Sequence, residues 1–436
     1  MNKQKILPKL TGKNMLLGFQ HVFAMFGATV LVPLITGLNV STTLLAAGLG
    51  TLLFHFITKG KVPAFLGSSF AFLGGFATVA PKLLDAQGNA TIPNIEMLPY
   101  ACGGVVCSGL LYVLVAGLVK AFGVKKVMRF FPPIVTGPII ISIGLILAPS
   151  AITNAATNWP LAILALTIII VCNIWGKGMV KIIPILLSVV ISYAVALVSG
   201  AVDFSSVMSA NLLGSPIIPS TFAKFELSAI ITIMPIALAS MMEHIGDIAA
   251  ISATTGENYI EDPGLHRTLL GDGIATSMAG FIGGPANTTY GENTGVLALT
   301  KVYDPAVVRL AAIIAVILSV IPKFDALVNT IPAAIIGGIS LILYGMISAI
   351  GVRNVVENQV DFTDSRNLII AAVILVSALG FSTVGGISFA VGSAHVTLSG
   401  LSIAAILGIF LNAVLPGNTY EFGKDLKADT SASLEI

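Results

Sequence analysis

The chain has 436 residues, of which 56% are hydrophobic and only 10% are charged. Soluble domains carry roughly 25% charged residues, so this composition excludes a water-soluble enzyme. The net charge of +2 is far too small for a nucleic-acid-binding protein, which needs a concentrated basic face. The three cysteines and five scattered histidines show no metal-ligand spacing, so we expect no metal site.

Apolar runs bounded by charged residues, proline or glycine predict fourteen membrane-spanning segments. The first seven lie near 15–37, 42–58, 64–80, 98–119, 130–149, 158–175 and 179–200. The second seven lie near 228–252, 268–283, 285–300, 305–322, 327–350, 367–384 and 396–415. The first run is too long for the h-region of a signal peptide, so we expect it to remain as a helix. The sequence therefore predicts an all-α polytopic membrane protein.

Lysine and arginine residues are distributed unevenly between the two ends of these segments. With the N-terminus in the cytoplasm, 19 of the 22 fall on the cytoplasmic side, and only Lys82, Lys224 and Lys323 fall outside. The positive-inside rule therefore predicts that both termini are cytoplasmic.

The two halves of the chain resemble each other weakly. The corresponding sites are Gln20-His21 with Glu243-His244, Ser68-Ser69-Phe70 with Thr288-Thr289-Tyr290, and Pro132 with Pro332. Because seven is an odd number, the second copy enters the membrane from the opposite face. We therefore expect two inverted seven-segment repeats, at 14–200 and 224–416, as in many secondary transporters.

The third and tenth segments are rich in glycine, proline, serine and threonine, which are poor helix formers in a segment interior. We expect short extended stretches at 68–72 and 288–291 that lead into half-helices. Irregular backbone at membrane depth survives only where it is buried in protein or lines a cavity, so this pair of segments predicts a binding site. The alternative is two glycine-rich helices that pack closely.

Four acidic residues lie within apolar segments: Glu243, Asp247, Asp272 and Glu292. An intramembrane carboxylate costs at least ~2.5 kcal/mol, which makes each of them a functional candidate. Glu243 and Asp247 share one helix face, where two negative charges repel, so we expect one of them to be protonated part of the time. Such a pair is suited to proton uptake; the alternative is a pair of structural carboxyls.

Glu292 is expected at the start of the second half-helix, where free backbone N–H groups carry a partial positive charge. The carboxylate would accept from a ligand, and the backbone of Tyr290 and Gly291 would donate to it. Phe70, at the matching position in the first half, either packs in the core or adds an aromatic face.

Residues 292–301 fit the signature of the nucleobase-ascorbate transporter family, also called the second nucleobase-cation symporter family. That signature is Gln or Glu, Asn, any residue, Gly, any four residues, Thr, then Arg, Lys or Gly. Gln20-His21 also matches the Gln-His pair in the family's first helix, and residues 15–415 resemble its bacterial uracil-transporting members. The resemblance implies a core domain of about 14–122 plus 224–322, a gate domain of about 127–200 plus 327–416, and a homodimer formed through the gate domain.

The resemblance also implies which residues bind the nucleobase. Glu243 and Glu292 would hold it, helped by Phe70, Tyr290 and Gly291. The supporting residues would be Gln20, His21, Ser69, Asp272 and Asn293. From the shared helix face of Asp247 and Glu243, we expect these two carboxyls to couple transport to a proton gradient, with no cofactor.

The chain is a mosaic of two branches of that family. Asp247 stands where the uracil transporters typically have histidine, and Asp272 resembles the purine branch, whose members generally have Gln at the position of Glu292. We expect a proton-coupled symporter that imports uracil across the cytoplasmic membrane by alternating access. Xanthine or another purine is the first alternative. An anion carrier needs a positive site, and no Lys or Arg lies near these residues in the chain.

Overall fold

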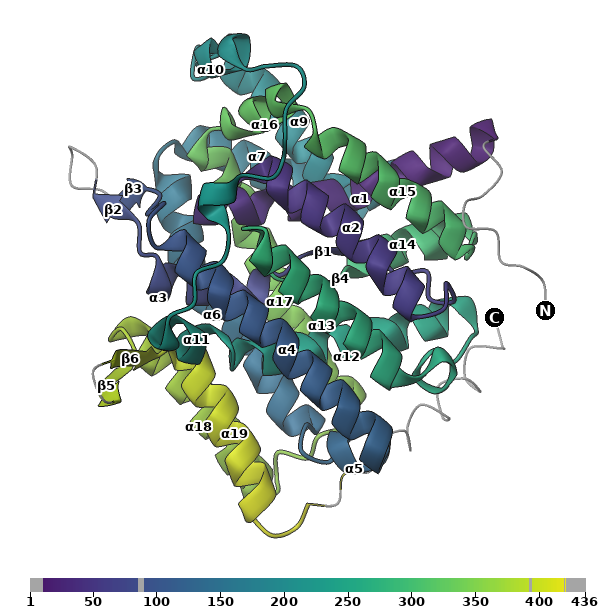
Figure 1. Ribbon diagram of the computed structural model, residues 1–436, viewed down its shortest axis with the longest axis vertical. Coiled ribbons are helices and arrows are strands. Elements are labelled where there is room, and N and C mark those ends of the chain that lie inside the picture. The colour runs from purple at the N-terminus through teal and green to yellow at the C-terminus, as the bar shows by residue number, and fades with distance from the viewer. Residues whose placement is uncertain (1–10, 85–89, 392–393, 419, 421–436) are drawn as a thin grey trace.

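The computed structural model describes residues 11–84, 90–391, 394–418 and 420, and most of them are helical (Figure 1). The main helices of the first half are α1 (Gly12–Thr36), α2 (Val40–Ile57), α3 (Leu73–Val79), α4 (Leu98–Phe122), α6 (Pro133–Ala156), α7 (Trp159–Trp175) and α9 (Pro184–Val198). Those of the second half are α12 (Ile236–Thr255), α13 (Leu265–Phe281), α14 (Gly291–Thr300), α15 (Pro305–Ser319), α17 (Ala333–Glu357), α18 (Ser365–Thr383) and α19 (Gly400–Val414). Each of the fourteen predicted segments therefore contains a helix.

Short helices and turns lie between these elements or extend them. They are η1 (Phe70–Phe72), α5 (Val124–Met128), α8 (Met179–Ile182), α10 (Ser205–Ser209), η2 (Pro219–Thr221), α11 (Leu227–Ile233), η3 (Ile260–Gly264) and α16 (Pro322–Asn329). The strands are β1 (Leu66–Ser68), β2 (Leu83–Leu84), β3 (Ala90–Ile92), β4 (Asn287–Thr289), β5 (Ile387–Val391) and β6 (Ala394–Leu398).

Seven helices of the described chain are long and apolar enough to cross a membrane. The bent pair α15 and α16, whose axes meet at 85°, raises this number to eight. The remaining segments contain shorter apolar helices, among them α7, α9 and α19. The prediction of a polytopic, mostly helical membrane protein is confirmed.

Helix packing follows the predicted twofold relation between the halves. The fourth segment packs on the ninth (α4 on α13), and the eleventh packs on the second (α15 on α2). Likewise α7 packs on α9 in the first half, and α18 packs on α19 in the second. The pair with the most extensive contact, α6 and α17, consists of the fifth and twelfth segments, so exchanging the halves maps it onto itself. Each contact thus has its counterpart in the other half, as inverted repeats require.

The extended stretches are present in segments three and ten, but their predicted bounds were wrong. β1 ends at Ser68, and Phe70–Phe72 form a 3-10 turn rather than extended chain. β4 ends at Thr289, and α14 already begins at Gly291. The reason is that each strand extends only as far as the other pairs with it, which the sequence of one segment does not reveal. β1 and β4 lie near the centre of the view in Figure 1.

Two hairpins were not predicted, β2 with β3 and β5 with β6. The second one replaces the first residues of the expected fourteenth helix, which begins only at Gly400. The twelfth helix also begins later than 327, at Ala333, because residues 322–329 form α16 and Pro332 precedes the new helix. The division into a core and a gate domain stays a prediction.

Close approach of α4 and α13 leads to a stability prediction. A Cβ atom at Gly109 would lie far inside van der Waals contact with the carbonyl oxygen of Gly273, whereas a Cβ atom at Gly117 in the same helix meets nothing within 4 Å. Gly109→Ala should therefore destabilise the protein by about 1–3 kcal/mol through overpacking. The matched control Gly117→Ala should gain up to ~1 kcal/mol from helix propensity. Thermal unfolding of the detergent-solubilised variants measures both; equal melting temperatures would contradict this account of the packing.

Candidate substrate-binding site

The two strands inside the membrane place two helix N-termini next to each other. β1 and β4 pair antiparallel, with Leu66 opposite Thr289 and Ser68 opposite Asn287. Backbone bonds extend the pairing, since Ser69 N donates to Ala286 O at 2.8 Å and Tyr290 N donates to Phe65 O at 3.0 Å. Each of these two strands leads into a helical segment: η1 and α3 follow β1, and α14 follows β4. The unpaired N–H groups of both helix starts therefore lie beside the strand pair.

Tyr290 is held inside the protein. Its hydroxyl donates to the Ser68 carbonyl oxygen at 2.9 Å and lies 3.1 Å from Ser68 Oγ and 3.4 Å from Thr29 Oγ1. Gly67 leaves room for the ring, because a Cβ atom there would collide with it. The backbone N–H of Tyr290 already donates to the carbonyl oxygen of Phe65, so the expectation that this N–H donates to a ligand was wrong. The N–H of Gly291, in the first turn of α14, is unaffected by that bond.

Glu243 on α12 and Glu292 on α14 both belong to the second half of the chain and lie near enough for their charges to repel. Glu292 is in the first turn of α14, as predicted, where the helix dipole favours a negative charge. Both residues are partly exposed, and Gly291, next to Glu292 in the chain, is exposed. A Cβ atom at Gly291 would be 3.5 Å from Asp247 Oδ1. The three carboxyls therefore border one region that is not sealed inside the protein.

Asp247 lies on the same face of α12 as Glu243 and is also partly exposed. Thr289 Oγ1 donates to Asp247 Oδ2 at 3.1 Å. Asp272 lies deeper: it is fully buried, and its Oδ2 is 3.1 Å from Nδ1 of the equally buried His244. Of the four intramembrane carboxyls, Asp272 is thus the one paired with an imidazole and removed from the open region.

His21 and Asn293 join α1 to α14. The amide nitrogen of Asn293 lies 3.1 Å from both the Nδ1 atom and the carbonyl oxygen of His21. Gln20 is partly exposed, and in the described chain its Oε1 atom has no hydrogen-bond partner. His21 and the Asn of the signature motif therefore act together, by fixing the start of the half-helix that carries Glu292.

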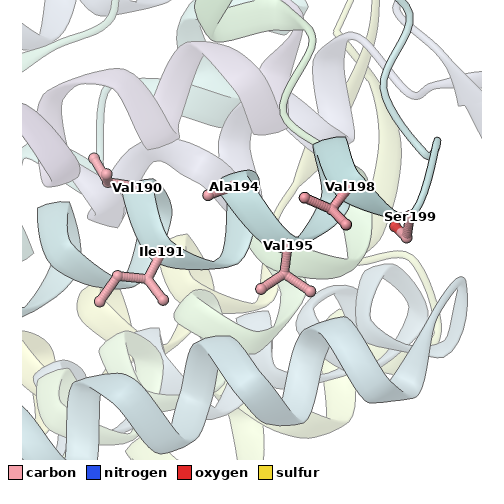
Figure 2. A pocket seen from close by; sticks show the side chains of 6 residues that line it. All are labelled: Val190, Ile191, Ala194, Val195, Val198 and Ser199. Atoms are coloured by element: carbon pink, nitrogen blue, oxygen red, sulfur yellow. The ribbon is translucent and has the colours of Figure 1, made fainter.

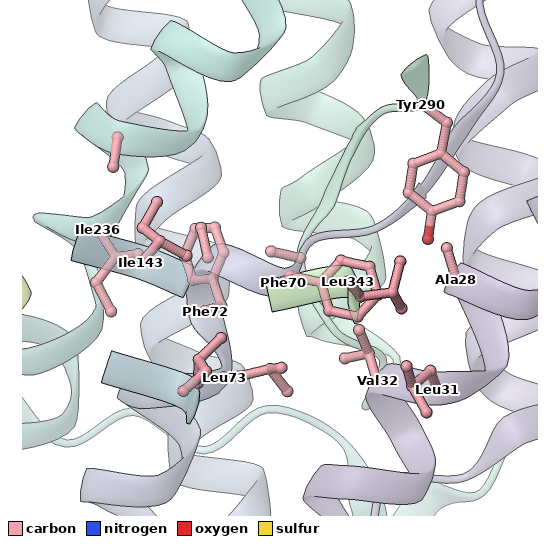
Figure 3. Packing of buried hydrophobic residues seen from close by; sticks show 14 of the residues in the cluster. Ala28, Leu31, Val32, Phe70, Phe72, Leu73, Ile143, Ile236, Tyr290 and Leu343 are labelled. Atoms are coloured by element: carbon pink, nitrogen blue, oxygen red, sulfur yellow. The ribbon is translucent and has the colours of Figure 1, made fainter. Parts of the chain in front are cut away.

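Phe70 and Ser69 lie at the start of the other half-helix. Ser69 Oγ is 3.3 Å from Ser240 Oγ, one turn before Glu243 on α12. Phe70 is 8% exposed and belongs to the apolar cluster that includes Val32 and Leu343 (Figure 3). Its ring meets the edge of Tyr344 on α17, with centroids 6.5 Å apart. Phe70 is thus mainly a packing residue at the border of the site.

Tyr344 was not predicted. It is 2% exposed, and its hydroxyl has no hydrogen-bond partner in the part of the chain that the structure describes. The available signal was a tyrosine in the middle of an otherwise apolar segment. Sequence reasoning missed it because nothing in the chain indicates that α17 packs against the start of the third segment.

A separate pocket lies on the surface of α9 and is lined by Val190, Ile191, Ala194, Val195, Val198 and Ser199 (Figure 2). Most of these side chains are exposed, and none is titratable. It offers apolar contact only and is not a site for a polar ligand. Among the described residues, no group of three or more His, Cys, Asp or Glu side chains could hold a metal ion.

Comparison with known proteins identifies the family. The sequence model of a permease family, Xan_ur_permease, matches residues 12–387. The chain is 40% identical to the uracil permease of Bacillus caldolyticus over 420 residues, which cover 93% of each protein. It is 38% identical to the uracil permease of Bacillus subtilis over 434 residues, covering 96% of this chain and 94% of the relative. The chain belongs to this permease family.

The resemblance to the nucleobase-ascorbate transporters is thereby confirmed, and the permease is a multi-span membrane transporter rather than an enzyme. Two solved structures share its fold. The transmembrane domain of the cyanobacterial bicarbonate transporter BicA has a TM-score of 0.61 at 15% identity, covering 87% of this chain and 99% of that one. The murine anion transporter Slc26a9 in its inward-facing state has a TM-score of 0.65 at 11% identity, covering 93% and 68%.

The bonds of Tyr290 lead to a prediction. Tyr290→Phe leaves the Ser68 carbonyl oxygen without its donor, so the protein should lose about 1–3 kcal/mol of stability. The matched control is Tyr112→Phe, which removes a buried hydroxyl that has no partner in the described chain and should change stability little. Thermal unfolding in detergent compares the two. If both variants melt at the wild-type temperature, the hydroxyl of Tyr290 does not stabilise the strand pair.

Proposed function

We propose that this permease is a proton-coupled symporter that imports uracil across the bacterial cytoplasmic membrane. Relatives from several bacteria that are named uracil permeases match more than nine-tenths of the chain. The proposal also includes both termini in the cytoplasm, supported by the distribution of lysine and arginine, and a homodimer through the gate domain, supported by the family resemblance.

The observation that carries this proposal is the placement of Glu243 and Glu292 beside the starts of two half-helices. Uracil has two ring N–H donors and two carbonyl acceptors. Two carboxyls and the N–H groups at Gly291 and Phe70 would satisfy all four polar edges of the ring. Each edge left unsatisfied in a dry site costs about 1–3 kcal/mol, so the match favours this substrate class.

Proton coupling is supported by the crowding of acidic groups. Glu243, Asp247 and Glu292 lie within range of mutual repulsion, and ionising all three next to a neutral substrate is unfavourable. Uptake of one proton relieves that repulsion as uracil binds. A proton carried with a neutral substrate moves one charge, worth ~2.3 kcal/mol per 100 mV, so transport should be electrogenic.

Alternating access is the mechanism that we propose for the movement. The site residues belong to the proposed core domain, whereas Tyr344 reaches Phe70 from α17 of the proposed gate domain. Relative movement of the two domains would expose the carboxyls first to one side of the membrane and then to the other. The contact between the rings of Phe70 and Tyr344 lies between the two proposed domains, which would have to move past each other.

Uptake of radiolabelled uracil into proteoliposomes with an imposed inward proton gradient tests the proposal. Competition by unlabelled xanthine distinguishes a pyrimidine substrate from a purine substrate. Asp247 and Asp272 leave the purine alternative open. We expect gradient-driven accumulation that excess uracil blocks and excess xanthine leaves largely intact. Stronger inhibition by xanthine than by uracil would assign the permease to purines.

Glu243→Gln should abolish uracil binding. An amide cannot accept equally well from a ring N–H group and cannot take up a proton, while neutralising an intramembrane charge lowers the cost of insertion. The variant should therefore fold, which size-exclusion chromatography of the detergent-solubilised protein checks. Wild-type uracil affinity, measured by calorimetry on the folded variant, would reject the role of Glu243.

Asp247→Asn should separate binding from proton coupling. Exchange of labelled for unlabelled uracil requires no net proton movement and should persist, whereas accumulation driven by the proton gradient should be lost. Both are measured in the same proteoliposomes. Accumulation with unchanged pH dependence in this variant would place the proton on Glu243 or Glu292 instead.

A further inference from the structure

Helix α16 lies where the chain passes from the proposed core domain to the proposed gate domain. It follows α15 at a bend of 85° and precedes α17, which begins at Ala333. The boundary expected from the sequence, between about 322 and 327, falls inside this helix. The contacts of α16 therefore decide to which of the two domains it is attached.

The carboxyl of Asp325 on α16 caps the N-terminus of α2, a helix of the proposed core domain. Its Oδ1 atom accepts from the Val40 backbone N–H at 3.1 Å, and its Oδ2 atom accepts from the Asn39 side-chain amide at 3.4 Å. The side chain of Asn39 in turn accepts from the Thr42 backbone N–H at 2.8 Å. A carboxylate is favoured at this position because the first N–H groups of a helix carry a partial positive charge. The start of α2 thus has one cap from its own segment and one from α16.

Further contacts attach α16 to the same part of the protein. The Phe324 ring packs on Phe26 of α1, with centroids 5.5 Å apart. Helix α16 also packs on α10, which belongs to the connection between the two halves of the chain (Figure 1). That connection is bonded to α2 as well, since Thr42 Oγ1 donates to the Pro216 carbonyl oxygen at 2.6 Å. Helices α1, α2 and α16 are therefore held together by side-chain contacts and by the connection.

A hydrogen bond to the proposed gate domain appears just after α16 ends. Thr330 Oγ1 and the hydroxyl of Tyr193 on α9 share this bond. One residue earlier, the side-chain amide of Asn329 still points back along α16 and donates to the Asp325 carbonyl oxygen at 2.9 Å. Pro332 then directly precedes α17. The change of attachment thus falls within the three non-helical residues 330–332.

We propose that α16 is a rigid arm of the core domain and that residues 330–332 are the hinge to the gate domain, an inference that rests on the proposed alternating access. The gate domain then begins at Ala333 rather than near 327. When the domains move past each other, α16 keeps its bonds to α1 and α2, and the backbone angles of the hinge change. Short segments at the ends of helices are where such changes are usually absorbed.

Cross-linking of cysteine pairs tests this inference in the full chain, after replacement of the three native cysteines by Cys102→Ala, Cys107→Ala and Cys172→Ala. The first pair, Phe26→Cys with Phe324→Cys, allows a bridging methanethiosulfonate reagent to join α16 to α1. Cross-linking should leave the initial rate of uracil uptake into proteoliposomes unchanged, because α16 and α1 move together. Uptake by the same protein before treatment is the reference.

The matched control pair joins the two proposed domains. Ser402 Oγ on α19 donates to the Thr232 carbonyl oxygen on α11 at 3.0 Å, so Thr232→Cys with Ser402→Cys places two thiols across this boundary. The same reagent should abolish uptake by this protein, because the domains can no longer move past each other. A reductant that removes the cross-link should restore uptake.

Loss of uptake on joining α16 to α1, restored by the reductant, would overturn the inference, because α16 would then move relative to the core. If the first pair prevents folding, hydrogen–deuterium exchange of the wild-type protein decides instead. The Val40 N–H, which Asp325 accepts, should exchange equally slowly with and without uracil, and faster exchange in the presence of uracil would also overturn the inference. If joining α11 to α19 leaves uptake unchanged, the proposed movement of the two domains has failed rather than the assignment of α16.

Discussion

The structure depends on one constraint: backbone that leaves the helical path inside a membrane needs hydrogen-bond partners from elsewhere in the protein. β1 and β4 supply them to each other, three residues from each half of the chain. A helical segment begins directly after each strand, so their pairing brings both helix starts to the same place. The hydroxyl of Tyr290, bonded to Ser68, ties the end of one strand to the other. The binding region is therefore a product of the strand pair.

Electrostatics divides the site into two layers. Glu243, Glu292 and Asp247 border the open region and repel one another, which makes their charge sensitive to a proton or a ligand. His244 and Asp272 form a closed layer behind them, where His244 Nδ1 lies 3.1 Å from Asp272 Oδ2. Thr289 lies between the layers. In the proposed function, a neutral nucleobase would be coupled to a proton because both would act on the same set of carboxyls.

The fold alone does not set this chemistry. The bicarbonate transporter BicA and the anion transporter Slc26a9 share the fold at 15% and 11% identity. In the permease, acidic side chains lie beside the two half-helix starts. A helix start attracts negative groups, so the same scaffold suits an anion when the neighbouring side chains are neutral or basic, and a donor-bearing neutral ring when they are acidic.

The sequence by itself determined the membrane class, the fourteen segments, the two weakly related halves and the intramembrane carboxyls, because hydropathy and rare buried charges are local properties of the chain. It also indicated that segments three and ten are irregular. It did not determine where the strands end, that the Tyr290 N–H is already used, that Tyr344 reaches Phe70, or that Thr289 connects Asp247 to His244. Those features depend on contacts between residues that are far apart in the chain. Only the tertiary packing of the segments decided them, since a hydrogen bond between distant residues leaves no pattern in either segment alone.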